Sequence, residues 1–135
     1  MTAPRAFTNY TLEFELQGLP KMSNQLLRGH WASKTGHARK WKFAVASKCA
    51  KLVKPPQPLT SAVLCLTRCS SREPDFDGLV SSFKHVIDGL VEARILAGDK
   101  MSVIGQPRYV WEKAPLRMGK IRVRVEETPL TKAKA

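Results

Sequence analysis

Alternating apolar and polar positions mark the first and the last ordered segments of the chain. Residues 11–16 and residues 121–126 each alternate apolar with polar or charged side chains, which predicts two strands with one buried face each. Residues 60–67 form a short, apolar run typical of a central strand. Tyr109 to Trp111 indicate a fourth strand.

The first predicted helix follows a long loop. Residues 20–36 contain prolines, glycines and small polar residues, which predict a loop with Trp31 as a candidate anchor. From residue 37 to about residue 53, apolar side chains recur on one face at helical spacing. Pro55-Pro56 ends this helix.

The second predicted helix carries the clearest apolar stripe. Apolar residues recur at three- and four-residue steps from Leu79 to Val91, so one side faces the core. The order strand, loop, helix, strand, helix, strand, strand predicts one small α/β (α+β) domain, a mixed sheet packed by two main helices. We expect this domain to span residues 1–127, followed by a disordered C-terminal tail at 128–135.

Composition and charge restrict the class of protein. No run reaches the ~18 apolar residues that a membrane span needs, and the first residues lack the apolar run of a signal peptide. We therefore expect a soluble, cytoplasmic protein. Lys and Arg number 23 against 11 Asp and Glu, a net charge of +12. This excess attracts polyanions and makes nucleic acid the expected partner, whereas a basic surface that only aids solubility is the alternative.

The cysteines do not predict a metal site. Cys49, Cys65 and Cys69 are odd in number and contain no Cys-x-x-Cys pair, although His30 and His37 could join them around zinc. Two of the three lie in apolar or helical patterns, where free cysteine behaves as a small apolar residue. Reduced thiols fit a cytoplasmic protein.

Acidic residues flank the second predicted helix. Asp75 and Asp77 lie two residues apart, and in an extended segment this spacing points both carboxylates to the same side. Carboxylates held close together repel unless a cation lies between them, and magnesium prefers such oxygen ligands. Asp99, after the break at Gly98, could supply a third carboxylate. An Asp that precedes a helix is also a common helix cap.

Three sequence runs carry a resemblance to a known family. They are Asp75-Phe-Asp-Gly-Leu79, Phe83-Lys-His-Val-Ile-Asp-Gly-Leu90 and Ile95-Leu-Ala-Gly-Asp99. They resemble the RusA family of Holliday junction resolvases, with its Asp-x-Asp-Asn-Leu, its Lys followed four residues later by Asp-Ala-Leu, and its later Asp-Asp pair. Residues 18–24 look like the family's Pro-Pro-Ser-x-Asn opening. The resemblance touches roughly residues 10–125, and the acidic run is its specific part.

The resemblance implies a site and an activity. Asp75, Asp77 and Asp99 would bind Mg²⁺, with Mn²⁺ as a substitute, and would activate the attacking water. Lys84 would take the place of the catalytic lysine, although Lys84 and Asp88 could also form an ordinary surface ion pair. A homodimer would make paired nicks in a four-way DNA junction, in a bacterium or as a phage or prophage protein. The candidate DNA contacts are Arg72, Arg68, Arg28, Asn24 and Lys21.

The sequence departs from the family pattern at three places. Gly78 replaces the Asn after the second Asp, and Gly98 replaces the first Asp of the pair. Seven residues separate Asp77 from Lys84, where the family has four. If the insertion is helical, Lys84 moves ~4.5 Å along the axis. Alternatively a serine at 81 or 82 caps the helix and the insertion loops out, which we favour.

Other functions also fit the sequence. They are a family member that binds branched DNA without cutting it, a general metal-dependent nuclease on the same fold, and a basic RNA-binding or ribosome-associated protein whose aspartates are caps. An acidic cluster repels phosphate unless a metal bridges them, so the three carboxylates favour a nuclease.

Overall fold

The computed structural model describes residues 9–22 and 31–128, with the backbone alone at residues 31–33. The predicted tail beyond Thr128 and two candidate DNA contacts, Asn24 and Arg28, lie outside these ranges. The elements follow in the order β1 (Thr11–Gln17), α3 (Trp31–Cys49), β2 (Ala62–Ser70), α4 (Phe76–Ser82), α5 (Lys84–Glu92), α6 (Met101–Ile104), β3 (Arg108–Lys113) and β4 (Lys120–Glu127).

The four strands form one mixed sheet in the order β1-β4-β2-β3. Strand β4 is antiparallel to both β1 and β2, whereas β3 runs parallel to β2. In the register, Val123 pairs with Phe14 on one side and with Leu66 on the other. The apolar positions of three strands therefore share one face, which confirms the predicted mixed sheet and its one-sided burial.

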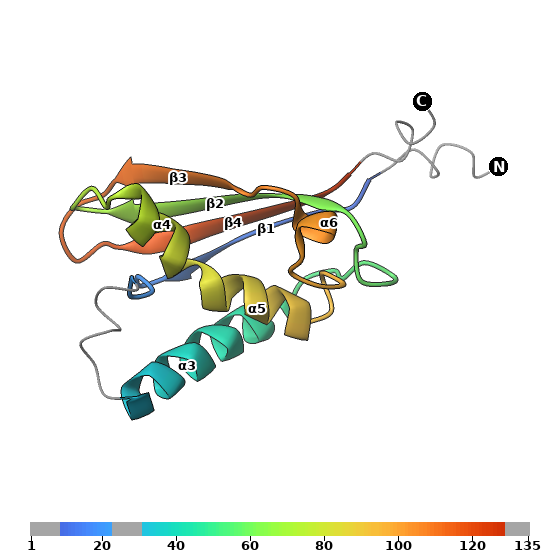
Figure 1. The fold of residues 1–135 in the computed structure, drawn as a ribbon, viewed down its shortest axis with the longest axis horizontal. Coiled ribbons are helices and arrows are strands. Elements are labelled where there is room, and N and C mark those ends of the chain that lie inside the picture. The colour runs from blue at the N-terminus through green and yellow to red at the C-terminus, as the bar shows by residue number, and fades with distance from the viewer. Residues whose placement is uncertain (1–8, 23–30, 129–135) are drawn as a thin grey trace.

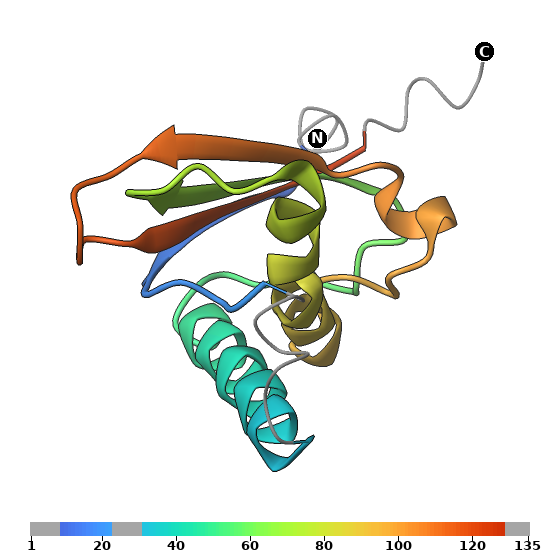
Figure 2. The same cartoon turned by 60° about the vertical axis from the view of Figure 1, so that its left-hand side comes forward.

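The helices of the described residues cover this apolar face, and none of them lies on the other face of the sheet (Figures 1 and 2). Helix α5 packs against α3, and the fully buried core includes Val45, Leu64 and Phe83. Gly89 permits the helix contact, because a Cβ atom there would lie 2.8 Å from the Cβ of Val45. No helix in the described ranges has the length and apolarity that crossing a membrane requires.

The first helix differs from the prediction at both ends. Helix α3 begins at Trp31 and ends at Cys49, so residues 31–36, predicted as loop, are helical. The loop prediction rested partly on Gly36. This residue lies within α3, and a Cβ atom added there would meet no other atom within 4 Å. One glycine costs a helix about 1 kcal/mol, and the buried Trp41 and Val45 offset that cost through packing.

The second predicted helix is two helices with a corner at Phe83. The backbone of Phe83 has φ −98° and ψ 3°, outside the helical region, and its side chain is fully buried. Its ring lies 6.1 Å from that of Tyr109, measured between centroids. The predicted apolar stripe is correct, but the segment bends at the buried Phe83, and α4 and α5 take different directions (Figure 1).

Strand β2 also extends further than expected. Arg68 was predicted to begin a polar turn, but its backbone pairs with Trp111 of β3 and Ile121 of β4. The ladder continues to Ser70, so the exposed connection to α4 is shorter than the sequence suggested. The four-residue helix α6 was not predicted.

Candidate functional site

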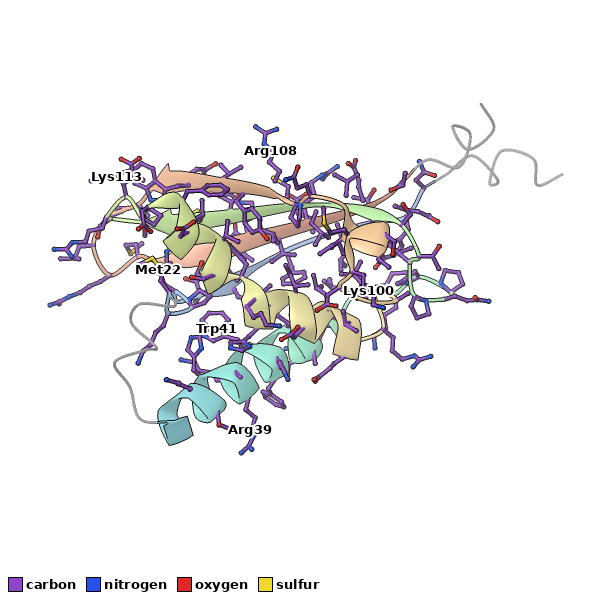
Figure 3. All side chains as sticks on the ribbon, viewed as in Figure 1. Met22, Arg39, Trp41, Lys100, Arg108 and Lys113 are labelled. Atoms are coloured by element: carbon purple, nitrogen blue, oxygen red, sulfur yellow. The ribbon has the colours of Figure 1, made fainter. Side chains whose placement is uncertain are left out.

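The two aspartates of the Asp-x-Asp run lie where β2 leads into α4. Because β2 and β3 run parallel, their carboxyl ends meet at one edge of the sheet. Lys113 ends β3 there, and its Nζ donates to the carbonyl of Ser71 at 2.9 Å. Figure 3 shows Lys113 and Met22 at the same end of the molecule as the start of α4. Asp75 and Asp77 are exposed at this edge.

Asp75 is the N-cap of α4. Its backbone is extended, and its Oδ1 accepts a hydrogen bond from the Gly78 nitrogen at 2.8 Å. The helix-cap alternative is therefore confirmed for Asp75. Asp77 lies in the first helical turn, so the expectation that the pair belongs to one extended segment is wrong. Both carboxylates nevertheless lie at the N-terminus of one helix, where its dipole favours negative charge.

Gly78 packs closely against this cap. A Cβ atom at position 78 would lie 2.6 Å from Asp75 Oδ1 and 2.7 Å from the Met22 sulfur. The Asn of the family pattern would not fit beside Asp75 and Met22 in this conformation. The replacement of the family's Asn by Gly78 therefore accompanies close packing of Asp75 and Met22 at this position.

Lys84 forms an ion pair within its own helix. Its Nζ lies 3.3 Å from Asp88 Oδ2, and the lysine side chain is 62% exposed. Ser82 donates to the carbonyl of Leu79, and α5 begins with no side-chain cap. The favoured interpretation, a serine cap with a looped-out insertion, is wrong because the inserted residues are helical in α4.

Asp99 lies on the connection between α5 and α6 and is exposed. Lys100, the next residue, caps α6 and lies beyond the end of α5 in Figure 3. Over residues 9–22 and 31–128, no three His, Cys, Asp or Glu side chains are grouped so that they could hold one metal ion. The structure thus brings Asp75 and Asp77 to one helix end and does not group Asp99 with them.

The predicted DNA contacts have different surroundings. Arg72 is exposed, whereas Arg68 is only 6% exposed and its Nη1 donates to the Pro20 carbonyl at 2.6 Å. Burial lowers the pKa of the Arg68 guanidinium from its ordinary value. Both arginines line a hollow of about 450 Å³ that also contains Asp75. Arg68 is therefore a buried residue that lines the same hollow as Asp75, and its predicted contact with DNA stays a prediction.

Lys21 joins the N-terminal segment to a histidine pair. The backbone nitrogen of Lys21 donates to His37 Nε2 at 2.9 Å. The rings of His37 and His85 lie 5.6 Å apart between centroids, in an edge-to-face arrangement. Burial, more than neighbouring charge, lowers the pKa of both imidazoles. In the region described, the Nδ1 atoms of both histidines are buried with no partner within hydrogen-bond distance, and His85 Nδ1 lies 3.6 Å from Asp88 Oδ2.

A basic helix is the feature that the sequence analysis missed. The chain has no Asp or Glu between residues 16 and 72. Of the cations at residues 34–54, Lys42 alone forms an ion pair within the described structure, with Glu92 at 3.3 Å. The unpaired ones are Lys34, Arg39, Lys40, Lys48, Lys51 and Lys54. Figure 3 shows Arg39 on the side of α3 away from the sheet. The distribution of the acidic residues along the chain could have revealed this surface.

The open face of the sheet is charged but balanced. Arg124 pairs with Glu13 at 3.0 Å and with Glu126 at 3.1 Å. Arg122 pairs with Glu15 and Glu112, both at 3.3 Å. Cations already neutralised in this way attract phosphate weakly. Arg122 and Arg124 are therefore weak phosphate ligands, whereas all the cations at residues 34–54 except Lys42 lack an ion pair within the described structure.

The cysteines are free thiols. Cys49 and Cys69 are buried and Cys65 is half-buried. Burial raises the pKa of the Cys49 thiol to about 11. Such a thiol stays protonated and is a poor metal ligand, which agrees with its expected role as a small apolar residue.

No family model matches the chain, and no curated protein matches it significantly. The sequence resemblance to the RusA family therefore stays a prediction.

Proposed function

We propose that this protein is a metal-dependent DNA endonuclease that resolves four-way junctions, as a member of the RusA family. The observation that carries the proposal is the exposed Asp75–Asp77 pair at the N-terminus of α4, beside a hollow lined by Arg68 and Arg72. Acidic groups beside arginines suit a site that holds a cation and a phosphate together.

The residues present fit Mg²⁺ in donor chemistry. Asp75 uses one oxygen for the cap, so Oδ2 is its candidate ligand atom, and Asp77 offers a second carboxylate. Asp99 enters the proposal on the sequence resemblance. Bound there, Mg²⁺ would supply Lewis acidity and lower the pKa of a bound water. The Asp75 cap holds one ligand in place before any metal arrives.

The surrounding cations bind and orient the DNA in this proposal. Arg72 on the rim contacts the backbone near the acidic pair, and the unpaired cations of α3 bind the phosphates of a neighbouring arm. Lys84 is held by Asp88, with Nζ to Oδ distances of 3.3 and 3.4 Å. Lys84 is the candidate for stabilising charge on the leaving oxygen, provided that the substrate draws it away from Asp88.

A non-catalytic nucleic-acid binder is the second candidate. It is favoured by the cap geometry of Asp75 and by the absence of a three-carboxylate group among the residues that the structure describes. In that case the aspartates would serve folding and α3 would carry the function.

A cleavage assay separates the two candidates. A labelled four-way junction and a matching linear duplex would be incubated with the full chain, with Mg²⁺ and with EDTA. We expect nicking of the junction only with Mg²⁺, its loss in Asp77→Asn, and its retention in Glu126→Gln, an exposed carboxylate of the open sheet face. Tight junction binding with no nicking under any divalent metal would support the binder instead.

A further inference from the structure

Arg68 is a buried cation without a carboxylate partner. The single hydrogen bond of its side chain in the described structure goes to the Pro20 carbonyl, and no Asp or Glu of the described residues lies within ion-pair distance. Burying a charge is costly unless an opposite charge compensates for it. Arg122 and Arg124 on the open sheet face, by contrast, each form ion pairs with two glutamates.

The free nitrogens of Arg68 face a hollow. The polar residues that line this hollow are Arg68, Ser70, Ser71, Arg72, Glu73 and Asp75. Within the described chain, the sealed side-chain nitrogens that lack a partner belong to His37 and His85. The remaining Arg68 nitrogens are therefore not sealed off and reach this hollow of about 450 Å³.

We propose that Arg68 binds a phosphodiester oxygen of the nucleic acid in this hollow. A planar guanidinium donates two parallel hydrogen bonds to phosphate, and its charge is then compensated. The neighbouring carboxylates repel a phosphate, so a divalent cation held by Asp75 strengthens binding. In this respect the inference rests on the proposed function. Arg68 would hold the phosphate beside the Asp75–Asp77 pair, and its hydrogen bond to the Pro20 carbonyl would keep the Arg68 side chain in place.

Trp111 reports on the hollow. It pairs with Arg68 across β2 and β3, and its Nε1 donates to Ser70 Oγ at 2.9 Å. Ser70 Oγ in turn donates to the Arg72 carbonyl at 2.8 Å. A ligand that engages Arg68 and this wall of the hollow will shift the indole N–H resonance of Trp111 in an NMR spectrum, and Trp111→Phe assigns that resonance.

The test is a titration of the full chain with a thymidine dinucleotide, followed by the Trp111 indole resonance, with Ca²⁺ and with EDTA. We expect a saturable shift that is stronger with Ca²⁺. Arg68→Gln should weaken binding at least about tenfold, and Arg68→Lys should restore part of it. Arg124→Gln, the same change at an arginine that is already paired, should leave the affinity unchanged. A parallel titration with inorganic phosphate in place of the dinucleotide shows whether free phosphate binds the site as tightly.

A second measurement does not depend on whether Arg68→Gln folds. The same dinucleotide with a neutral methylphosphonate in place of the phosphate should fail to shift Trp111 in the wild-type protein. An equal shift by the neutral analogue, binding of inorganic phosphate as tight as that of the dinucleotide, or wild-type affinity in Arg68→Gln would each overturn the assignment.

The outcomes also separate this inference from the proposed activity. If the wild-type protein nicks junctions with Mg²⁺ but Arg68→Gln binds the dinucleotide normally, the proposed nuclease function stands and the Arg68 site is wrong. If the protein binds the dinucleotide through Arg68 but never nicks a junction, the Arg68 site stands and the nuclease proposal is wrong.

Discussion

Asp75 Oδ1 and the backbone nitrogen of Gly78 lie 2.8 Å apart, so the carboxylate proposed as a metal ligand is also the cap of α4. The two roles predict different consequences for two substitutions. Asn caps a helix about as well as Asp, whereas Ala costs about 1 kcal/mol. We therefore expect Asp75→Asn to keep the wild-type free energy of unfolding and to lose nicking, and Asp75→Ala to lose both. Urea unfolding and the junction assay measure the two effects. Full nicking by Asp75→Asn would remove Asp75 from the metal site.

Position 78 provides a second test of the same contact. Gly78→Ala places a Cβ atom 2.6 Å from Asp75 Oδ1 and 2.7 Å from the Met22 sulfur. Although Ala is the better helix former, we expect this variant to be less stable than wild type, by about 1 kcal/mol or more once the cap is displaced. Gly36→Ala is the matched control, because open space surrounds its Cβ position in α3, and it should stabilise the protein. Equal gains at both positions would show that the cap adjusts freely.

The metal dependence follows from the ligand chemistry. Mg²⁺ and Mn²⁺ favour octahedral coordination by oxygen and position water for attack, whereas the larger Ca²⁺ accepts looser geometry. We expect nicking with Mg²⁺ or Mn²⁺, and junction binding with little nicking in Ca²⁺. The junction assay with each metal measures this directly. Full activity in EDTA would contradict the mechanism.

The unpaired cations of α3 predict a strong salt dependence of DNA binding. Each phosphate that the protein neutralises contributes about 0.9 to the slope of log affinity against log salt. Arg39→Gln and Lys48→Gln should each weaken junction binding and lower that slope, whereas Arg124→Gln on the balanced sheet face should do neither. Fluorescence anisotropy over a range of salt concentrations gives the slopes. Identical slopes for all three variants would place the DNA elsewhere.

The histidine pair predicts that stability falls in mild acid. Burial lowers the pKa of His37 and His85 in the folded state, so the unfolded chain takes up protons first as pH falls below about 6.5. The contribution of the neutral pair to the stability of the fold is thus fully present above that pH. It is lost as the pH falls towards the lowered pKa of the folded state. We expect the melting temperature to drop on acidification, and His37→Gln with His85→Gln to flatten the drop. An unchanged pH profile in the double variant would exclude the pair as its cause. The charged groups around the pair are Lys21, Lys40, Lys42, Lys84 and Asp88.

The sheet was predictable from the sequence because a period of two in apolar positions directly reports a one-sided strand. The corner at Phe83 was not, since an apolar residue at helical spacing looks the same in a straight helix and in a bend. Its contact with Tyr109, distant in sequence, accompanies the bend. Arg68 shows the converse: a polar residue suggested a turn, but strands on both sides extend the ladder past it.

The candidate site was predictable in its residue types and less so in its geometry. The spacing of Asp75 and Asp77 did not reveal whether the helix begins before or after the second aspartate. That depends on the cap at Gly78, which packs against Met22. Asp99 lies on a connection without periodic pattern, so neither helix nor strand spacing could locate it relative to the pair.

Oligomeric state is the last prediction, and it connects the proposed function with symmetry. A four-way junction has near two-fold symmetry, and its resolution needs two nicks at symmetric positions. One 15.1 kDa chain offers one Asp75–Asp77 pair, so a single subunit would cut one strand at a time. A two-fold dimer places two such pairs symmetrically, and isologous contacts are the commonest route to this arrangement. Sedimentation or light scattering at micromolar concentration should therefore give about twice the chain mass. The mass should stay the same in Asp77→Asn, because that exposed carboxylate is assigned to the metal. A strict monomer, both alone and on a junction, would contradict paired cleavage and would favour a single-strand nickase or a binder.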